Sequence, residues 1–147
     1  MENDGKQVCV LLVEDDPGDQ KLIKTALMDQ GCEINLKIAS SGEAAMDYLK
    51  MSTEDAVRYS RPSLILLDLN MPGMGGKAFL KKIKADEDLC SIPVVVVTTS
   101  DSETDIRECY ASHAAGYIEK SAVPEEFGDV LKRLTRYWFS VSAVLKG

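Results

Sequence analysis

Residues 63–76 read SLILLDLNMPGMGG, an apolar run that ends abruptly in an acidic side chain. The run from 63 to 67 is almost wholly apolar, which is typical of a strand buried on both faces of a parallel sheet. Asp68 follows directly, and the proline and glycines after it indicate a turn. In open parallel sheets, ligands bind at the carboxyl ends of the strands. This stretch therefore predicts an α/β fold and the sheet edge where functional side chains should lie.

Apolar runs of the same kind recur along the chain and alternate with segments of helical period. Strands are predicted at Val8–Val13, Ile34–Ala39, 63–67, 92–97 and Gly116–Glu119. Between them, apolar residues repeat at the spacing of one helix face, and the last such stripe runs from Phe127 past Trp138. Five strands in strict alternation with five helices predict a doubly wound (βα)5 parallel sheet with helices on both faces.

Several helix ends carry capping signals. Asp16 can cap the first helix, and Ser40 with Glu43 forms a capping-box pattern for the second. Pro124 suits the first turn of the last helix. Segment 51–61 has no sustained period, so it is predicted to be a long surface loop.

Length and composition narrow the classes of protein further. The 147 residues, 45% of them hydrophobic, predict one domain over 1–147 with a helix extension at about 137–147. The net charge of −7 disfavours direct binding to DNA or to anionic membranes. Four dispersed cysteines and one histidine lack the ligand spacing of a zinc site. Without a signal peptide or a long apolar span, the expected location is cytoplasmic.

Polar side chains gather where the predicted strands end. Glu14 and Asp15 follow the first strand and Asp68 the third, and carboxylates at one sheet edge repel unless a cation binds. Hard oxygen ligands favour Mg²⁺, and the alternative is a solvated acidic turn. Thr98 ends the fourth strand and Lys120 follows the fifth. Taken alone, Thr98 could be an ordinary strand-end residue and Lys120 an ordinary surface lysine. Together, the five side chains suit phosphoryl transfer to a carboxylate.

Four segments carry a resemblance to a known family: LLVEDDP at 11–17, LLDLNMPGMGG at 66–76, VVTTS at 96–100 and YIEK at 117–120. In these segments the chain resembles the receiver domains of two-component response regulators, over about residues 7–140. The resemblance implies a CheY-like, flavodoxin-like sheet with strand order 2-1-3-4-5. It also implies that the chain is a phosphoprotein in a phosphorelay. Such a protein catalyses its own phosphorylation and dephosphorylation but is otherwise not an enzyme.

The resemblance implies a metal site and a phosphoacceptor. Asp68 would accept the phosphoryl group on its carboxylate. Mg²⁺, for which Mn²⁺ or Ca²⁺ could substitute, would be held by Glu14, Asp15, Asp68 and the main-chain carbonyl of Asn70. Asn70 and Ser100 would flank the acyl phosphate and tune its hydrolysis.

The same resemblance implies a switch. Thr98 would hydrogen-bond the new phosphoryl group, and Lys120 would pair with another of its oxygens. Tyr117 would be the aromatic side chain that reports the switch, although half-buried packing on an edge strand is an equally simple role for it. Ser121 stands where the family usually has proline, so a cis peptide at this junction would cost about 3 to 4 kcal/mol.

A narrower resemblance is to single-domain regulators paired with phytochrome-type histidine kinases. It lies in the EDDPGD opening, the long segment before the third strand, the TTS and KSA segments and the YWFS tail. It implies a sensor histidine kinase as partner, and a homodimer through the last elements. Tyr137, Trp138 and Phe139 are the candidate dimer surface, together with Val141, Val144 and Leu145; the alternative is a helix packed on its own core.

Other functions fit less well. An aspartyl phosphatase of the haloacid dehalogenase type needs a second Asp two positions after Asp68, where this chain has Asn70. No glycine-rich phosphate loop follows any strand, which disfavours a nucleotide- or flavin-binding module. A phosphate sink or relay, and a pseudo-receiver that only binds partners, stay open as alternatives.

Overall fold

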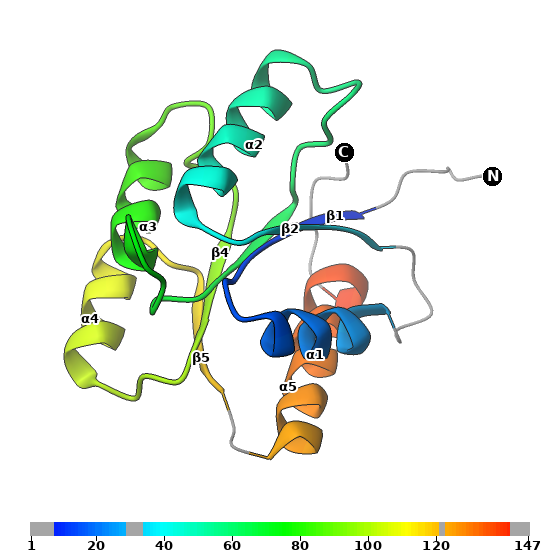
Figure 1. The fold of residues 1–147 in the computed structure, drawn as a ribbon, viewed down its shortest axis with the longest axis vertical. Helices are drawn as coiled ribbons and strands as arrows, with labels where there is room; N and C mark the ends of the chain where they lie inside the picture. The colour runs from blue at the N-terminus through cyan, green and yellow to red at the C-terminus, as the bar shows by residue number, and fades with distance from the viewer. Residues whose placement is uncertain (1–7, 29–33, 121–122, 142–147) are drawn as a thin grey trace.

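The computed structural model describes residues 8–28, 34–120 and 123–141. Five parallel strands form one sheet in the order β2-β1-β3-β4-β5, which confirms the predicted fold (Figure 1). The strands are β1 (Val8–Val13), β2 (Ile34–Ala39), β3 (Leu64–Leu67), β4 (Val94–Thr98) and β5 (Gly116–Glu119). The helices are α1 (Pro17–Met28), α2 (Gly42–Glu54), α3 (Gly75–Ala85), α4 (Glu103–Ala111) and α5 (Pro124–Arg136), followed by a π-helical turn at Tyr137–Val141.

Alternate residues of the buried strands point to opposite faces of the sheet, and each face has its own helices. Leu11, Val13, Ile65 and Leu67 pack in one cluster with residues of α2, α3 and α4, including Phe79. Val10, Leu12, Leu64 and Leu66 pack in a second cluster with residues of α1 and α5, including Phe127. Figure 1 shows α1 and α5 together on one side of the sheet and the other three helices on the opposite side. Both faces of the central strands are thus covered, as their uniformly apolar sequence predicts.

The predicted loop at 51–61 is wrong at its start, because α2 continues to Glu54. The hydroxyls of Ser52 and Thr53 donate hydrogen bonds to the carbonyl oxygen of Leu49, at 2.8 and 3.0 Å. Ser52 is therefore buried although its side chain is polar. The spacing of apolar residues does not reveal this last turn of the helix.

One predicted helix cap is confirmed and one is shifted. Asp16 Oδ2 accepts from the Asp19 backbone N–H at 2.8 Å, as expected of a cap for α1. The cap of α2 is Ser41 rather than Ser40, since Ser41 Oγ accepts from the Ala44 N–H at 3.0 Å.

The π-helical turn after α5 carries the three aromatic residues of the predicted dimer surface. Trp138 and Phe139 are half-buried against the cluster under α1 and α5, while Tyr137 is 54% exposed. Packing on the chain's own core therefore accounts for two of these three side chains. Val144, Leu145 and the Lys120–Ser121 peptide lie outside the described residues. Within the described part of the chain, no helix is both long and apolar enough to span a membrane.

Candidate functional site

Three carboxylates meet at the carboxyl ends of β1 and β3. The parallel register pairs Val13 with Leu67, so Glu14 and Asp68 leave neighbouring strands at the same level. One carboxylate oxygen from each of Glu14, Asp15 and Asp68 lies within 4.8 Å of the others. Glu14 and Asp68 are buried and Asp15 is half-buried. The structure thus brings together the three acids that the sequence placed at one edge.

The turn after β3 fixes Asp68 through its backbone. The N–H groups of Met71 and Gly76 both donate to the Leu69 carbonyl oxygen at 3.1 Å. Gly76 packs so closely that a Cβ atom there would lie 2.6 Å from Leu69 Cα and clash with the Asp68 carbonyl oxygen. Glu43 accepts from the Met74 N–H at 3.2 Å, so this predicted capping residue ties the turn to α2 instead. The roles of Gly76 and Glu43 were not predicted from the sequence.

Lys120 reaches the acids from the end of β5. Its backbone N–H donates to the Thr98 carbonyl oxygen at 2.7 Å, which extends the β4–β5 pairing by one residue. Its Nζ lies 2.7 Å from Glu14 Oε1, 2.7 Å from Asp19 Oδ2 and 3.9 Å from Asp68 Oδ1. Asp19 was not predicted as a site residue, because no sequence pattern near it indicates that it lies close to Lys120.

Burial governs the charge state of the site. Desolvation raises the pKa of Glu14 to about 7, although the hydrogen bond from Lys120 and the Asp16 backbone N–H oppose this shift. Desolvation also raises the pKa of Asp68, against the opposing attraction of Lys120. For Lys120, burial lowers the pKa, but its hydrogen bonds to Asp19 and Glu14 outweigh burial and leave the pKa raised. The acids therefore hold their charges at a cost that a cation would relieve.

The donor set fits a divalent cation. Three carboxylates offer hard oxygen atoms within reach of one ion, and one buried ammonium cannot neutralise them all. Asn70 lies two residues after Asp68, with its backbone N–H 3.4 Å from Asp68 Oδ1, so its main chain follows the edge of the same site. The three carboxylates are thus compatible with a divalent metal, while a ligand role for the Asn70 carbonyl stays a prediction.

Thr98 and Tyr117 are joined through Ser100 rather than directly. Thr98 is fully buried, and its Oγ1 accepts from Asn70 Nδ2 at 3.4 Å and from the Ser100 N–H at 3.3 Å. The Tyr117 hydroxyl donates to the Ser100 carbonyl oxygen at 2.8 Å, and its half-buried ring packs against the core. Packing and switching are therefore compatible for Tyr117. Ser100 thus links the two side chains through one hydrogen bond to each.

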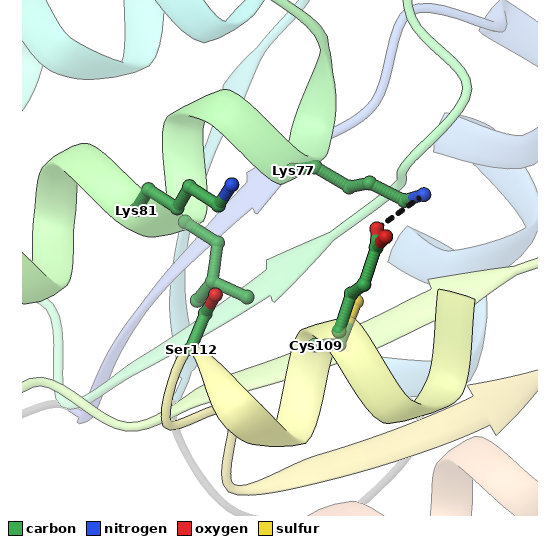
Figure 2. A pocket seen from close by; sticks show the side chains of 6 residues that line it. Lys77, Lys81, Cys109 and Ser112 are labelled. Atoms are coloured by element: carbon green, nitrogen blue, oxygen red, sulfur yellow. Dashed lines mark ion pairs between the residues drawn. The ribbon is translucent and has the colours of Figure 1, made fainter. Parts of the chain in front are cut away.

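A small cleft lies between α3 and α4, and Lys77 and Glu108 are among the residues that line it. Figure 2 shows Lys77 of α3 extending toward α4, where it pairs with Glu108 at 2.9 Å. Lys77 also pairs with Asp105, whose Oδ2 accepts from Ser100 Oγ at 2.6 Å. The segment that carries Ser100 is thus tied to the start of α3. No sequence pattern around Lys77 or Asp105 predicts this ion pair.

The raised pKa of Glu14 predicts an unusual pH dependence for the metal-free protein. Folded Glu14 binds its proton more tightly than unfolded Glu14, so its contribution to stability is full below pH 4.5 and is lost as pH rises to about 7. Between these values the free energy of unfolding should fall by about 1 to 3 kcal/mol from this group. Urea unfolding across the range measures this slope. In the control variant Glu14→Gln the slope should be smaller, and equal slopes would contradict the prediction.

Comparisons with known proteins agree with this geometry. The family model described as response regulator receiver domain matches residues 10–132. The chain is 37% identical over 129 residues to the response regulator Rcp1 of Synechocystis sp., covering 88% of this chain and 87% of Rcp1. A probable methanogenesis regulatory protein, FilR2, of Methanothrix harundinacea is 36% identical over 129 residues, covering 88% of this chain and 82% of FilR2.

Solved structures show the same likeness. The phosphorylated cyanobacterial phytochrome response regulator RcpA superposes with a TM-score of 0.87 at 38% identity, covering 94% of this chain and 98% of RcpA. The Mn²⁺-bound form of Rcp1 superposes with a TM-score of 0.86 at 35% identity, covering 94% of this chain and 99% of Rcp1. One of these relatives is thus known with a phosphoryl group and the other with a divalent metal.

Proposed function

Because the chain belongs to the response regulator receiver domain family, we propose that Asp68 accepts a phosphoryl group from a sensor histidine kinase. The observation that carries this assignment is the convergence of Asp68, Glu14, Asp15 and Lys120 at one buried edge of the sheet. Phosphoryl transfer needs a nucleophile, positive charge on the phosphoryl oxygens and firm positioning, and this edge combines all three.

The transfer step is a displacement at phosphorus. An Asp68 carboxylate oxygen attacks the phosphorus of the phosphohistidine, and the P–N bond breaks with its electron pair left on the imidazole nitrogen, which is then protonated. When bound by Glu14, Asp15, Asp68 and the Asn70 carbonyl, Mg²⁺ would supply positive charge against the phosphoryl oxygens. Lys120 would pair with another of these oxygens. The firm backbone of the turn holds the nucleophile in place.

Loss of the phosphoryl group is a separate reaction, a hydrolysis in which the chain would assist. Water attacks the phosphorus, the bond to the Asp68 oxygen breaks, and inorganic phosphate leaves. Asn70 and Ser100 are the residues proposed to tune this step. Neither has a side chain that acts as a strong base. The proposed chemistry is confined to the phosphorylation and dephosphorylation of the chain's own Asp68, with no external substrate turned over.

The proposed output is a change in protein contacts. The phosphorylated side chain carries about two negative charges, and because the carboxylate loses its own charge, the net gain at the sheet edge is about one. Thr98 would turn toward it, giving up its contacts with Asn70 and Ser100, and Ser100 passes the change to Tyr117. The affected surface is formed by α4, β5 and α5, so binding of a partner or of a second copy would depend on phosphorylation.

Names of relatives support a phytochrome-type kinase as the partner. RcpA is a cyanobacterial phytochrome response regulator, and this chain superposes on nearly all of it. A homodimer that uses Tyr137, a cytoplasmic location and the absence of direct DNA binding belong to the same proposal. The exposure of Tyr137 supports the homodimer, and the acidic net charge supports the absence of direct DNA binding. A phosphate sink or relay would use the same chemistry with a different partner.

Incubation with acetyl phosphate tests the chemistry without the kinase. With Mg²⁺ present, intact-mass spectrometry should show a gain of one phosphoryl group, because acetate leaves as the Asp68 carboxylate attacks. Removing the metal with a chelator should lower the phosphorylated fraction by at least about tenfold. A chain that binds Mg²⁺ yet takes no phosphoryl group from acetyl phosphate or from a phytochrome-type kinase would favour the pseudo-receiver alternative.

A further inference from the structure

Lys120 donates hydrogen bonds to two carboxylates in this structure, those of Glu14 and Asp19, while Asp68 lies at ion-pair distance only. Its Nζ is 2.7 Å from both Glu14 Oε1 and Asp19 Oδ2, but 3.9 Å from Asp68 Oδ1. An ammonium group has three N–H donors, so two are already committed. The distance to Asp68 is too long for a hydrogen bond. Lys120 is therefore held among the acids without a hydrogen bond to the nucleophile.

The two contacts differ in how easily they can be given up. The side chains of Lys120 and Glu14 are 7% and 2% exposed, so separating them would leave a buried charge without a partner. The Asp19 side chain is 34% exposed and can turn to water at little cost. Of the two contacts, the one with Asp19 is therefore the one that Lys120 can exchange for a new partner.

The fold fixes the backbone of Asp19 at this place independently of Lys120. Asp19 lies in the first turn of α1, where the helix dipole favours a negative charge. Its backbone N–H donates to Asp16 Oδ2 at 2.8 Å, which anchors the turn. Lys120 comes from the far end of the chain, after β5. Asp19 thus has an anchored backbone and a mobile carboxylate beside a lysine that phosphoryl chemistry needs.

We propose that Asp19 is a positioning residue that occupies an N–H donor of Lys120 until a phosphoryl group on Asp68 takes the place of the Asp19 carboxylate. This inference rests on the proposed function of Asp68 and Lys120. No covalent bond is involved, since Lys120 exchanges one anionic hydrogen-bond acceptor for another. Asp19 consequently competes with the phosphoryl group, which weakens phosphoryl binding and shortens the lifetime of the phosphorylated state.

Beryllofluoride, which occupies the phosphoryl position without a covalent transfer, measures this competition in the presence of Mg²⁺. In Asp19→Asn the side chain keeps its size and loses its charge, so beryllofluoride should bind roughly threefold more tightly, as for loss of one partly exposed ion pair. Protein labelled by acetyl phosphate should lose its phosphoryl group roughly threefold more slowly. The matched control is Asp16→Asn, which removes the same charge nearby and keeps a good helix cap; its values should equal those of the wild type.

A double variant separates positioning from general structural effects. If Asp19 acts through Lys120, the change Asp19→Asn should have no effect on beryllofluoride affinity in a Lys120→Ala background. Weaker or unchanged binding in Asp19→Asn, or the same gain in the Lys120→Ala background, would overturn the inference. A wild-type protein that binds no beryllofluoride and takes no phosphoryl group would instead overturn the proposed function, and this inference with it.

Discussion

Replacing Asp68 with asparagine is expected to abolish phosphorylation while leaving the fold intact. The amide is close in size to the carboxylate but cannot attack phosphorus, so the phosphorylated fraction after treatment with acetyl phosphate should fall by at least about a hundredfold. Stability should rise, because the buried Asp68 carboxylate lies beside Glu14 and Asp15 and its pKa is raised by desolvation. A gain of about 1 kcal/mol in the metal-free protein is expected.

Intact-mass spectrometry and thermal unfolding check the two halves of this prediction. The control is Asp47→Asn, which makes the same chemical change on the exposed surface of α2 and should alter neither measurement. A phosphorylated Asp68→Asn protein would place the acceptor elsewhere, with Glu14 and Asp15 as the neighbouring carboxylates. A destabilised and unphosphorylated variant would instead indicate that the substitution damages the fold.

The change Gly76→Ala should cost stability, although it lies in a helix where alanine is ordinarily favoured by about 1 kcal/mol. The new Cβ would meet backbone atoms of Asp68 and Leu69, which cannot move aside as a flexible side chain would. Overpacking of this kind costs about 1 to 3 kcal/mol. Because the clash is with the peptide that carries Asp68, phosphorylation by acetyl phosphate should also decline.

Gly128→Ala is the matched control for this substitution. It lies in α5, and a Cβ atom there would meet nothing within 4 Å. It should therefore stabilise the protein by about 0.5 to 1 kcal/mol. Chemical unfolding of the two variants would show shifts of opposite sign. If Gly76→Ala proved as stable as Gly128→Ala, the close packing of α3 on the Asp68 turn would not be a real constraint.

The strands and the acidic edge could be predicted because their signals are local. Continuous apolar runs indicated buried strands, and the polar residues that follow them indicated the edge of the sheet. The end of α2 could not be predicted in this way, since buried Ser52 satisfies its hydroxyl within the helix and leaves no apolar signal. The capping box was a local pattern too, but Glu43 bonds to the turn after β3 instead.

The positions of Asp19 and Gly76 depend on how distant elements pack. Asp19 contacts Lys120 across 101 positions of sequence, and no short pattern encodes that distance. Adjacent glycines at 75 and 76 signal a turn, but only the packing of α3 shows that the second one lies against the backbone of Asp68. The roles assigned to Thr98, Tyr117 and Ser100 come from the family resemblance and stay predictions.

The bond between Lys120 and Glu14 joins residues 106 positions apart, which follow β5 and β1 on either side of β3 and β4. During synthesis, the acids of β1 and β3 emerge from the ribosome well before the lysine that pairs with them. Contacts of such long range form late and slow the folding of a chain. Competence for phosphorylation would then be acquired in a single late step, so that a nascent or truncated chain lacking β5 does not draw phosphoryl groups from the kinase.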